Sequence, residues 1–348
     1  MSDDTLPPVF FQHGGMMSAD SWLGNQIDAN SPFFALVDDG HHVYLGNNRG
    51  NEYSQSHTSI SWPSAEFYDY DYSGYFYDVA AQTSAMMDNY PGTELGIYVG
   101  FSMGTLQWLG ASSMGALGVS PYNSIAQNIQ HAILLAPCTI IENQGAVGEL
   151  TNLGIYSIPS DNWEVDQATI CDTLGAESAN CYLASYATAE DSGRLASKIL
   201  DHVGQNYEVG VFGAYVDDWE NSSKTVNPWP LEGITVPHTL IIAELDDTCP
   251  PTTAQTLIDT FSDSGILAGS YTMLNQTHDF FMYSNAEEYV DALEAEIANV
   301  IAGTAISVDG PFATEVTIVP PSDDDDDSAF NSLSAAFAVT FALLQFVF

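Results

Sequence analysis

A serine at the centre of a Gly-x-Ser-x-Gly pentapeptide, Gly100-Phe101-Ser102-Met103-Gly104, is the residue with the clearest chemical signature. An apolar run typical of a strand, residues 95–99, precedes it, and a helix-like run, residues 105–113, follows it. In that setting the pattern predicts a nucleophile elbow, a sharp turn that holds the serine in a strained backbone conformation and exposes its hydroxyl. Glycines are expected on both sides because a side chain there would clash with the neighbouring strand and helix.

A nucleophilic serine needs a base to remove its proton and an acid to orient that base. When the serine lies in such an elbow, the acid and then a histidine follow it along the chain. Asp246 comes just after the strand-like run 239–243, and His278 lies between the last predicted strand and the last predicted helix. The sequence therefore predicts that Asp246 orients His278, which deprotonates Ser102, with the adjacent Asp247 as the alternative acid.

Acyl transfer also needs hydrogen-bond donors for the negative oxygen that develops in the transition state. The backbone N–H of Met103, directly after the serine, is one expected donor. The second is expected from the His-Gly-Gly segment after the first strand-like run, with Gly15 as the candidate and Met16 as the alternative. This mechanism requires no metal and no cofactor, and the sequence predicts neither.

Strand-length and helix-length patterns alternate along most of the chain. The predicted strands are 9–12, 42–45, 95–99, 132–135, 239–243 and 271–274, and the predicted helices include 76–89, 105–113, 252–262 and 286–301. Alternation of this kind indicates an α/β protein whose mostly parallel sheet is covered by helices on both faces.

The alternation stops in the middle of the chain, and this divides the sequence into four parts. Residues 1–137 and 236–305 are predicted to form one core, and residues 138–235 an inserted cap over the carboxyl ends of the strands. Residues 306–348 read as an acidic linker followed by a hydrophobic tail.

The charge balance is extreme, with 46 acidic residues, only 4 lysines and arginines, and a net charge of −42 over 348 residues. Nucleic acid is excluded as an expected partner because phosphate contacts need a basic surface. The apolar content of 45% identifies a globular chain and not an acidic disordered one. Self-repulsion of this size points to a saline or acidic extracellular setting.

The cysteines and two Asn-x-Ser/Thr triplets are compatible with a secreted protein. Cys171 and Cys181 lie ten residues apart in a polar segment and could close a small loop, or all four cysteines could be unpaired thiols. Asn221 and Asn275 are candidate glycosylation sites.

The two ends of the chain give different signals. Residues 1–4 have neither the basic nor the apolar region of a signal peptide. Residues 323–327 are five aspartates, and 13 of the 16 residues from 333 to 348 are apolar. A polar spacer before an uncharged apolar end predicts a GPI-type attachment signal, with a tail-anchoring helix as the alternative. Because such a signal implies secretion, we expect the natural N-terminus to lie upstream.

Several blocks together resemble the acid lipases of the gastric and lysosomal type. They are residues 11–22, the segment Leu-Gly-Asn-Asn-Arg-Gly-Asn at 45–51, the serine elbow, and the segments around Asp246 and His278. The resemblance runs from about residue 8 to about residue 302, and the 45–51 segment is its most specific part.

The resemblance implies an α/β-hydrolase core with a cap, a neutral-lipid ester substrate at a lipid–water interface, and a secreted, lysosomal or vacuolar location with an acidic pH optimum. It also implies a cap disulfide, which Cys171 and Cys181 would match, and a structural role for Arg49. The chain departs from the family by lacking its N-terminal segment, by Gly15 in place of leucine, by Phe101 and Met103 within the elbow, and by one residue fewer after His278.

These observations lead to one main functional hypothesis and two alternatives. The main hypothesis is a lipase that cleaves acylglycerols or steryl esters through an acyl-enzyme. The alternatives are a short-chain carboxylesterase and a non-catalytic surface or binding protein that keeps the hydrolase fold. Membrane attachment through the tail is compatible with all three.

Overall fold

One parallel sheet organises the structure. The computed structural model describes residues 2–15, 17–23, 31–141, 164–165, 195–278, 280–283 and 287–303. Within them six strands lie in the order β2-β1-β3-β4-β7-β8, and each neighbouring pair is parallel. These strands are β1 (Val9–Gln12), β2 (Val43–Leu45), β3 (Gly96–Phe101), β4 (Ile129–Leu135), β7 (His238–Ala243) and β8 (Leu267–Met273). The six predicted strands are therefore all present, and the α/β class with a parallel sheet is confirmed.

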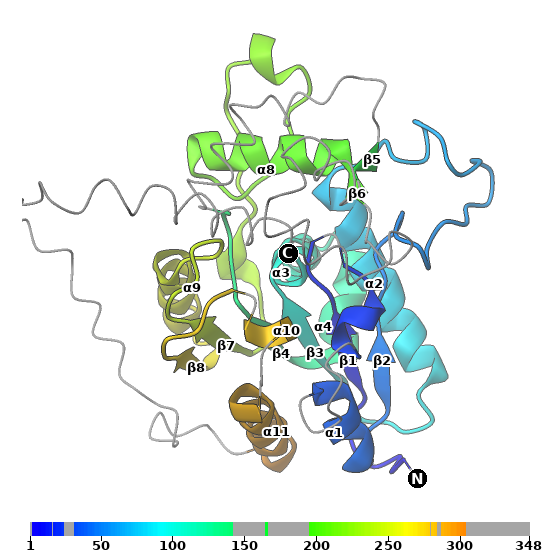
Figure 1. Cartoon of the computed structure of the whole chain (residues 1–348), viewed down its shortest axis with the longest axis vertical. Coiled ribbons are helices and arrows are strands. Elements are labelled where there is room, and N and C mark those ends of the chain that lie inside the picture. Colours follow the sequence, from blue (N-terminus) through cyan, green and yellow to red (C-terminus); the bar gives the residue numbers. More distant parts are fainter. Residues whose placement is uncertain are drawn as a thin grey trace, which may run out of the picture.

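Helices cover both faces of the sheet (Figure 1). The longer ones are α2 (Tyr72–Asn89), α3 (Met103–Ala116), α8 (Ser197–Val209), α9 (Pro251–Asp263) and α11 (Glu287–Ala302), and the shorter ones are α1 (Pro32–Asp38), α4 (Ile125–Asn128) and α10 (Phe280–Tyr283). Short 3₁₀ turns occur at Ala19–Trp22, Tyr122–Ser124, Trp219–Asn221 and Leu231–Gly233, and β5 (Glu164–Val165) pairs with β6 (Leu195–Ala196) in a second, antiparallel sheet.

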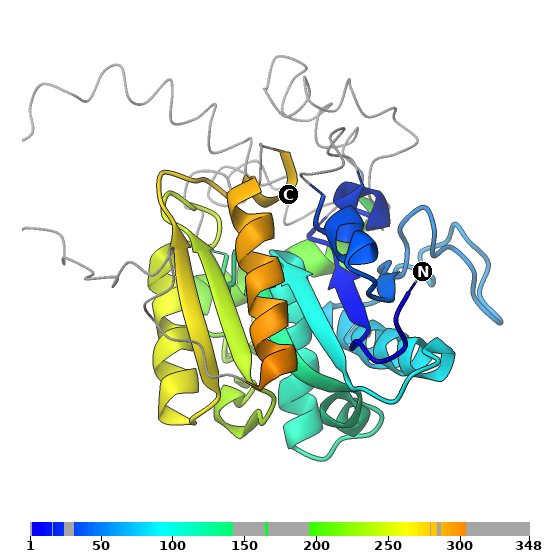
Figure 2. The same cartoon turned by 90° about the horizontal axis from the view of Figure 1, so that it is seen from below.

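The strands divide their side chains between two cores because successive residues of a strand point to opposite faces. On β1, Phe10 belongs to the core that packs against α2, α3 and α9. Val9 and Phe11 belong to the core that packs against α1 and α11, and Figure 2 shows α11 crossing that face of the sheet. Burial on both faces explains why these strands read as continuous apolar runs in the sequence.

The strand order reverses direction at β1, and this places the candidate site. From β1 the chain pairs β2 on one side and then β3 on the other. In open parallel sheets such a reversal leaves a crevice at the carboxyl ends of the two strands. The His-Gly-Gly segment leaves β1 and Ser102 leaves β3, so both lie at this position.

The predicted cap is described only in part. Helix α8 packs against the start of α2, where buried His202 accepts a hydrogen bond from the backbone N–H of Tyr72 (3.4 Å) and donates one to the Gly213 carbonyl (2.7 Å). Figure 1 shows α8 beyond one end of the sheet. The boundaries 138–235 remain a prediction, and the tail, residues 306–348, lies outside the described residues.

A second buried histidine lies in the core beneath α3. His238, fully buried at the start of β7, accepts a hydrogen bond on Nε2 from the indole N–H of Trp108 (2.7 Å). Burial disfavours the imidazolium form and lowers the pKa of His238 to about 3. The ring is therefore neutral in the folded protein over the whole range in which the unfolded chain takes up its proton.

This difference predicts acid-dependent stability. As pH falls below 6.5 the unfolded chain binds a proton at His238 before the folded protein does, so the free energy of unfolding falls with pH. With a pKa of about 3 in the folded protein, the loss between pH 7 and pH 5 amounts to about 2 kcal/mol. His238→Gln keeps an acceptor for Trp108 and removes the titrating group. Urea unfolding at both pH values should show a smaller loss in the variant, and an equal loss in both proteins would contradict the assignment.

Candidate active site

The turn at Ser102 joins β3 to α3 in a conformation that non-glycine residues rarely adopt. Ser102 has φ 50° and ψ −117°, a positive φ that stores strain. The surrounding structure holds it there. The Ser102 N–H donates to the Leu135 carbonyl of β4 (3.0 Å), and the N–H and Oγ1 of Thr105 donate to the Ser102 carbonyl (2.8 and 2.7 Å).

The two glycines of the pentapeptide are required by close backbone approach. An added Cβ at Gly104 would lie 2.6 Å from the carbonyl oxygen of Gln12 and 3.0 Å from that of His13. An added Cβ at Gly100 would lie 3.0 Å from the Gly104 backbone. Helix α3 therefore begins in direct contact with the loop that leaves β1. A side chain at position 104 would clash with that loop, as the sequence predicts.

Three predicted residues, far apart in the chain, meet through hydrogen bonds. His278 Nε2 lies 2.8 Å from Ser102 Oγ, and His278 Nδ1 lies 2.8 Å from Asp246 Oδ2. All three side chains are buried, and the Phe101 ring packs on the His278 ring with centroids 5.1 Å apart. In this arrangement the imidazole can accept the serine proton while the carboxylate stabilises the charge that forms.

The loop after β7 also holds the second oxygen of the carboxylate. Asp246 Oδ1 accepts hydrogen bonds from the backbone N–H groups of Thr248 (3.0 Å) and Cys249 (2.7 Å). Asp247, the alternative acid, has an exposed side chain. The carboxylate that contacts His278 is thus the one favoured by the sequence.

The predicted oxyanion donors lie close to each other. An added Cβ on Gly15 would lie 3.4 Å from Met103 Cε and 3.9 Å from Met103 Cβ. The Met103 N–H belongs to the first turn of α3, where a helix offers its donors no internal acceptor. Met16, the alternative donor, lies outside the described residues.

Fully buried His13 fixes the loop that carries Gly15, a role that the sequence alone did not predict. Its ring donates from Nδ1 to the Gly14 carbonyl (2.8 Å) and accepts on Nε2 from the backbone N–H of Asn48 (3.2 Å). Burial lowers the pKa of His13 to about 4, which keeps the ring in this neutral form. The sequence contained one signal for this role of His13, which was the presence of both the His-Gly-Gly segment and the Leu-Gly-Asn segment.

Residues 45–51, the most specific segment of the resemblance, form the support of this loop. The Asn47 side chain accepts from the Ala19 N–H (2.9 Å), and the Asn48 side chain accepts from the Gln12 amide (2.9 Å). Arg49 pairs with Asp78 of α2 through Nε and Nη2, with a shortest distance of 2.6 Å. Arg49 therefore contacts structural partners, consistent with the role that the resemblance implies.

The structure contains a disulfide that the sequence did not predict. Cys138, after β4, is bonded to Cys249, after β7, with the Cα atoms 5.0 Å apart. Cys171 and Cys181 lie outside the described residues, so their pairing remains a prediction. The alternative prediction, that all four cysteines are unpaired thiols, is wrong because Cys138 and Cys249 are bonded. Asn221 and Asn275 are both exposed, and their glycosylation remains a prediction.

One cluster of possible metal-binding atoms lies at the site, within 4.8 Å of one another, on Asp246, Cys249 and His278. These atoms already have other partners. The Cys249 sulfur is in the disulfide, and both nitrogens of His278 are hydrogen-bonded. We therefore assign the cluster to the hydrogen-bonded site and not to a metal centre.

Comparison with known proteins identifies the fold. Residues 7–144 match a family model described as the α/β hydrolase fold. A solved monoacylglycerol lipase of Paleococcus ferrophilus superposes with a TM-score of 0.52 at 12% identity, covering 86% of this chain and 97% of the other. The chain thus has the α/β-hydrolase fold, as predicted.

The resemblance to the acid lipases is also confirmed. The chain is 31% identical over 174 residues to the lysosomal acid lipase/cholesteryl ester hydrolase of Macaca fascicularis, covering 49% of this chain and 41% of that protein. It is 33% identical over 137 residues to the gastric triacylglycerol lipase of Rattus norvegicus, covering 39% and 32%. The aligned part thus spans well under half the length of these relatives.

The elbow geometry leads to a prediction about Gly104. Gly104→Ala forces a Cβ against the backbone of residues 12 and 13, and should destabilise the fold by about 1–3 kcal/mol, the usual cost of overpacking. It should also slow the reaction of Ser102 with a fluorophosphonate probe. Gly233→Ala is the matched control, since its Cβ would meet only the Ala116 Cβ, at 3.2 Å. Equal stability and labelling of the two variants would contradict the role given to Gly104.

Proposed function

We propose that this protein is a serine hydrolase of carboxylic esters that acts on neutral lipids such as acylglycerols or steryl esters. The observation that carries the proposal is the chain of hydrogen bonds from Ser102 Oγ through the His278 ring to Asp246, with 2.8 Å at each step. The strained turn that presents Ser102 and the similarity to acid lipases support it.

The proposed reaction has two halves. His278 takes the proton of Ser102 as its oxygen attacks the ester carbonyl, and Asp246 stabilises the resulting imidazolium. The N–H groups of Gly15 and Met103 receive the oxyanion, and the proton on His278 passes to the departing alcohol. In the second half His278 activates water, which releases the carboxylic acid and restores the serine. Burial of the three side chains excludes bulk water and strengthens these charge interactions.

Support for a lipid-like ester comes from the relatives and from apolar surface near the site. Leu245 and Leu274 are 54% and 50% exposed. They lie on the loops that carry Asp246 and His278, and these loops are joined by a hydrogen bond from the Leu245 N–H to the Gln276 carbonyl (2.8 Å). Apolar side chains beside a catalytic site favour apolar substrates over charged ones.

The location of the protein is part of the proposal. Since the relatives include lysosomal and gastric enzymes, we propose a secreted, lysosomal or vacuolar protein. Among the described residues, none of the helices has the length and apolarity needed to cross a bilayer. Attachment through a GPI-type signal or a tail anchor therefore rests on the sequence of residues 306–348 alone.

The first test removes the nucleophile. Ser102→Ala should lower hydrolysis of p-nitrophenyl butyrate and of emulsified trioleoylglycerol by roughly 10⁴-fold or more, because residual catalysis without the serine is small. Ser112→Ala on the same helix is the matched control, since the Ser112 hydroxyl is buried and has no hydrogen-bond partner among the described residues.

Two outcomes of this test would change the proposal. Equal hydrolysis by wild type and Ser102→Ala would refute the mechanism. Cleavage of the butyrate alone by the wild type would instead indicate a short-chain esterase.

The second test compares the two adjacent aspartates. Asp246→Asn should lower kcat by roughly 10⁴-fold, because an amide cannot stabilise the imidazolium and favours the wrong imidazole tautomer. Asp247→Asn removes the same charge one residue away, from an exposed side chain, and should leave kcat within a few-fold of wild type. Steady-state kinetics on p-nitrophenyl butyrate measures both. A larger loss in Asp247→Asn would exchange the roles of the two residues.

A further inference from the structure

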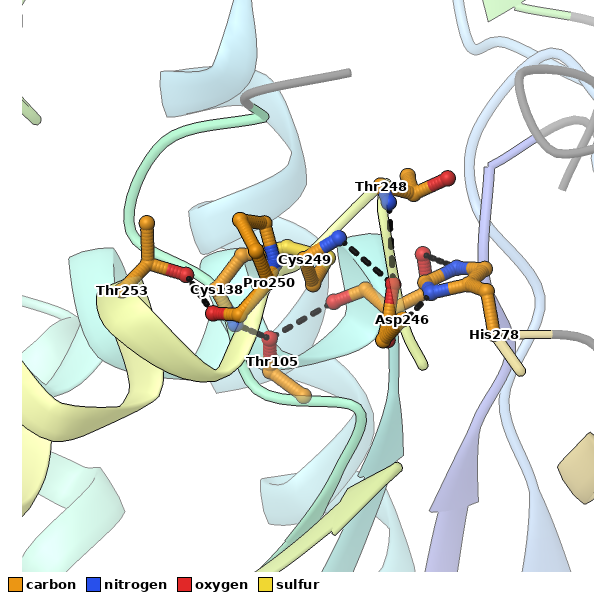
Figure 3. Close-up of a disulfide and its surroundings, with 9 residues drawn as sticks. Thr105, Cys138, Asp246, Thr248, Cys249, Pro250, Thr253 and His278 are labelled. Atoms are coloured by element: carbon orange, nitrogen blue, oxygen red, sulfur yellow. Dashed lines mark hydrogen bonds and ion pairs between the residues drawn. A yellow bond between two sulfur atoms is a disulfide. The ribbon is translucent and has the colours of Figure 1, made fainter. Parts of the chain in front are cut away.

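The Cys138–Cys249 disulfide joins two loops at the carboxyl edge of the sheet (Figure 3). Cys138 lies in the loop that leaves β4, and Cys249 lies between Asp246 and the start of α9. Strands β4 and β7 are neighbours, so the bond connects two adjacent strand ends although 111 residues separate the cysteines. Both cysteines are buried, at 0% and 1% exposure.

One end of the disulfide is attached to the carboxylate of the site. The backbone N–H of Cys249 makes the shorter of the two hydrogen bonds to Asp246 Oδ1, at 2.7 Å against 3.0 Å from Thr248. The other carboxylate oxygen contacts His278. A displacement of the Cys249 backbone would therefore change the orientation of the carboxylate toward the imidazole.

The other end is attached to the turn that carries the serine. The Cys138 N–H donates to Thr105 Oγ1 (3.2 Å), and this hydroxyl donates to the Ser102 carbonyl (2.7 Å). With the bonds through His278, the contacts form a closed ring, which runs through Ser102, Thr105, Cys138, Cys249, Asp246 and His278. The disulfide is the covalent link of that ring.

We propose that the Cys138–Cys249 disulfide is a positioning element for Asp246, which holds the carboxylate in register with His278 and Ser102. This inference rests on the proposed serine-hydrolase function. Without the bond, the loop that supplies the N–H groups to Asp246 is held by its strand and helix ends and not by the Ser102 turn. Because misplacement by about 1 Å can cost a hundredfold in rate, the bond affects turnover and not only stability.

The experiment removes the bond in two ways. Two double variants are compared with wild type, Cys138→Ala/Cys249→Ala and Cys138→Ser/Cys249→Ser. An effect seen in only one of them is then a packing defect of that side chain and not an effect of the lost disulfide. Thr253→Val is the matched control, since it removes a hydrogen bond to the Pro250 carbonyl in the same region and has no bond to Asp246. Circular dichroism reports the fold, and titration with a fluorophosphonate counts reactive serines.

The expected result separates positioning from stability. Per titrated site, kcat on p-nitrophenyl butyrate falls by about 10-fold to 100-fold in both double variants while KM changes less than about threefold. A structural role alone lowers the number of titrated sites and leaves kcat per site unchanged. Thr253→Val should match wild type in both measurements.

A double-mutant cycle links the effect to the acid. In an Asp246→Asn background, loss of the disulfide should lower kcat no further, because the bond acts through the carboxylate. Additive losses would overturn the inference, and so would unchanged kcat per site or loss of the fold in both pairs. Failure of the underlying function appears separately, as undiminished hydrolysis by Ser102→Ala, and the inference then falls with it.

Discussion

The close approach of α3 to the loop after β1 is the constraint on which the site depends. Because residue 104 is a glycine, the first turn of α3 can contact the backbone of residues 12 and 13. Two residues earlier, Ser102 adopts a positive φ in the turn that leads into the helix. The same approach brings Gly15 next to Met103. One backbone contact therefore places both the serine and the proposed oxyanion donors, and any side chain in the position of the glycine would separate them.

Backbone N–H groups donate the hydrogen bonds that stabilise negative charge at the candidate site. With a net charge of −42 and four basic residues, few side chains can offset negative charge. Arg49 pairs with Asp78, Lys198 with Asp69 and Lys224 with Glu208, so each of these three cations already has an acidic partner. Asp246 is held by two backbone N–H groups, and the proposed oxyanion donors are also backbone groups at a helix start. Such donors carry no side-chain charge, so the site is compatible with an acidic protein.

Much of the fold could be predicted because the local patterns were strong. Strands buried on both faces appear as unbroken apolar runs, and a Gly-x-Ser-x-Gly turn between strand and helix depends on five consecutive residues. Helices α1 and α8 were not predicted. Helix α1 has seven residues, and α8 lies in a stretch whose patterns are mixed because its buried face includes polar residues such as His202 and Gln205. The supporting role of residues 45–51 required knowing which loops touch.

The sequence by itself determined the class of fold, the serine turn and the order of serine, acid and histidine, because each can be read from short local patterns: strand and helix runs, one pentapeptide, and single residues that follow predicted strands. Only the tertiary structure decided which of two consecutive aspartates touches His278, that His13 supports the Gly15 loop, and that Cys138 pairs with Cys249. Those outcomes depend on distances between strand ends, and a linear pattern carries no information about which loops emerge side by side until the sheet has set its order and register.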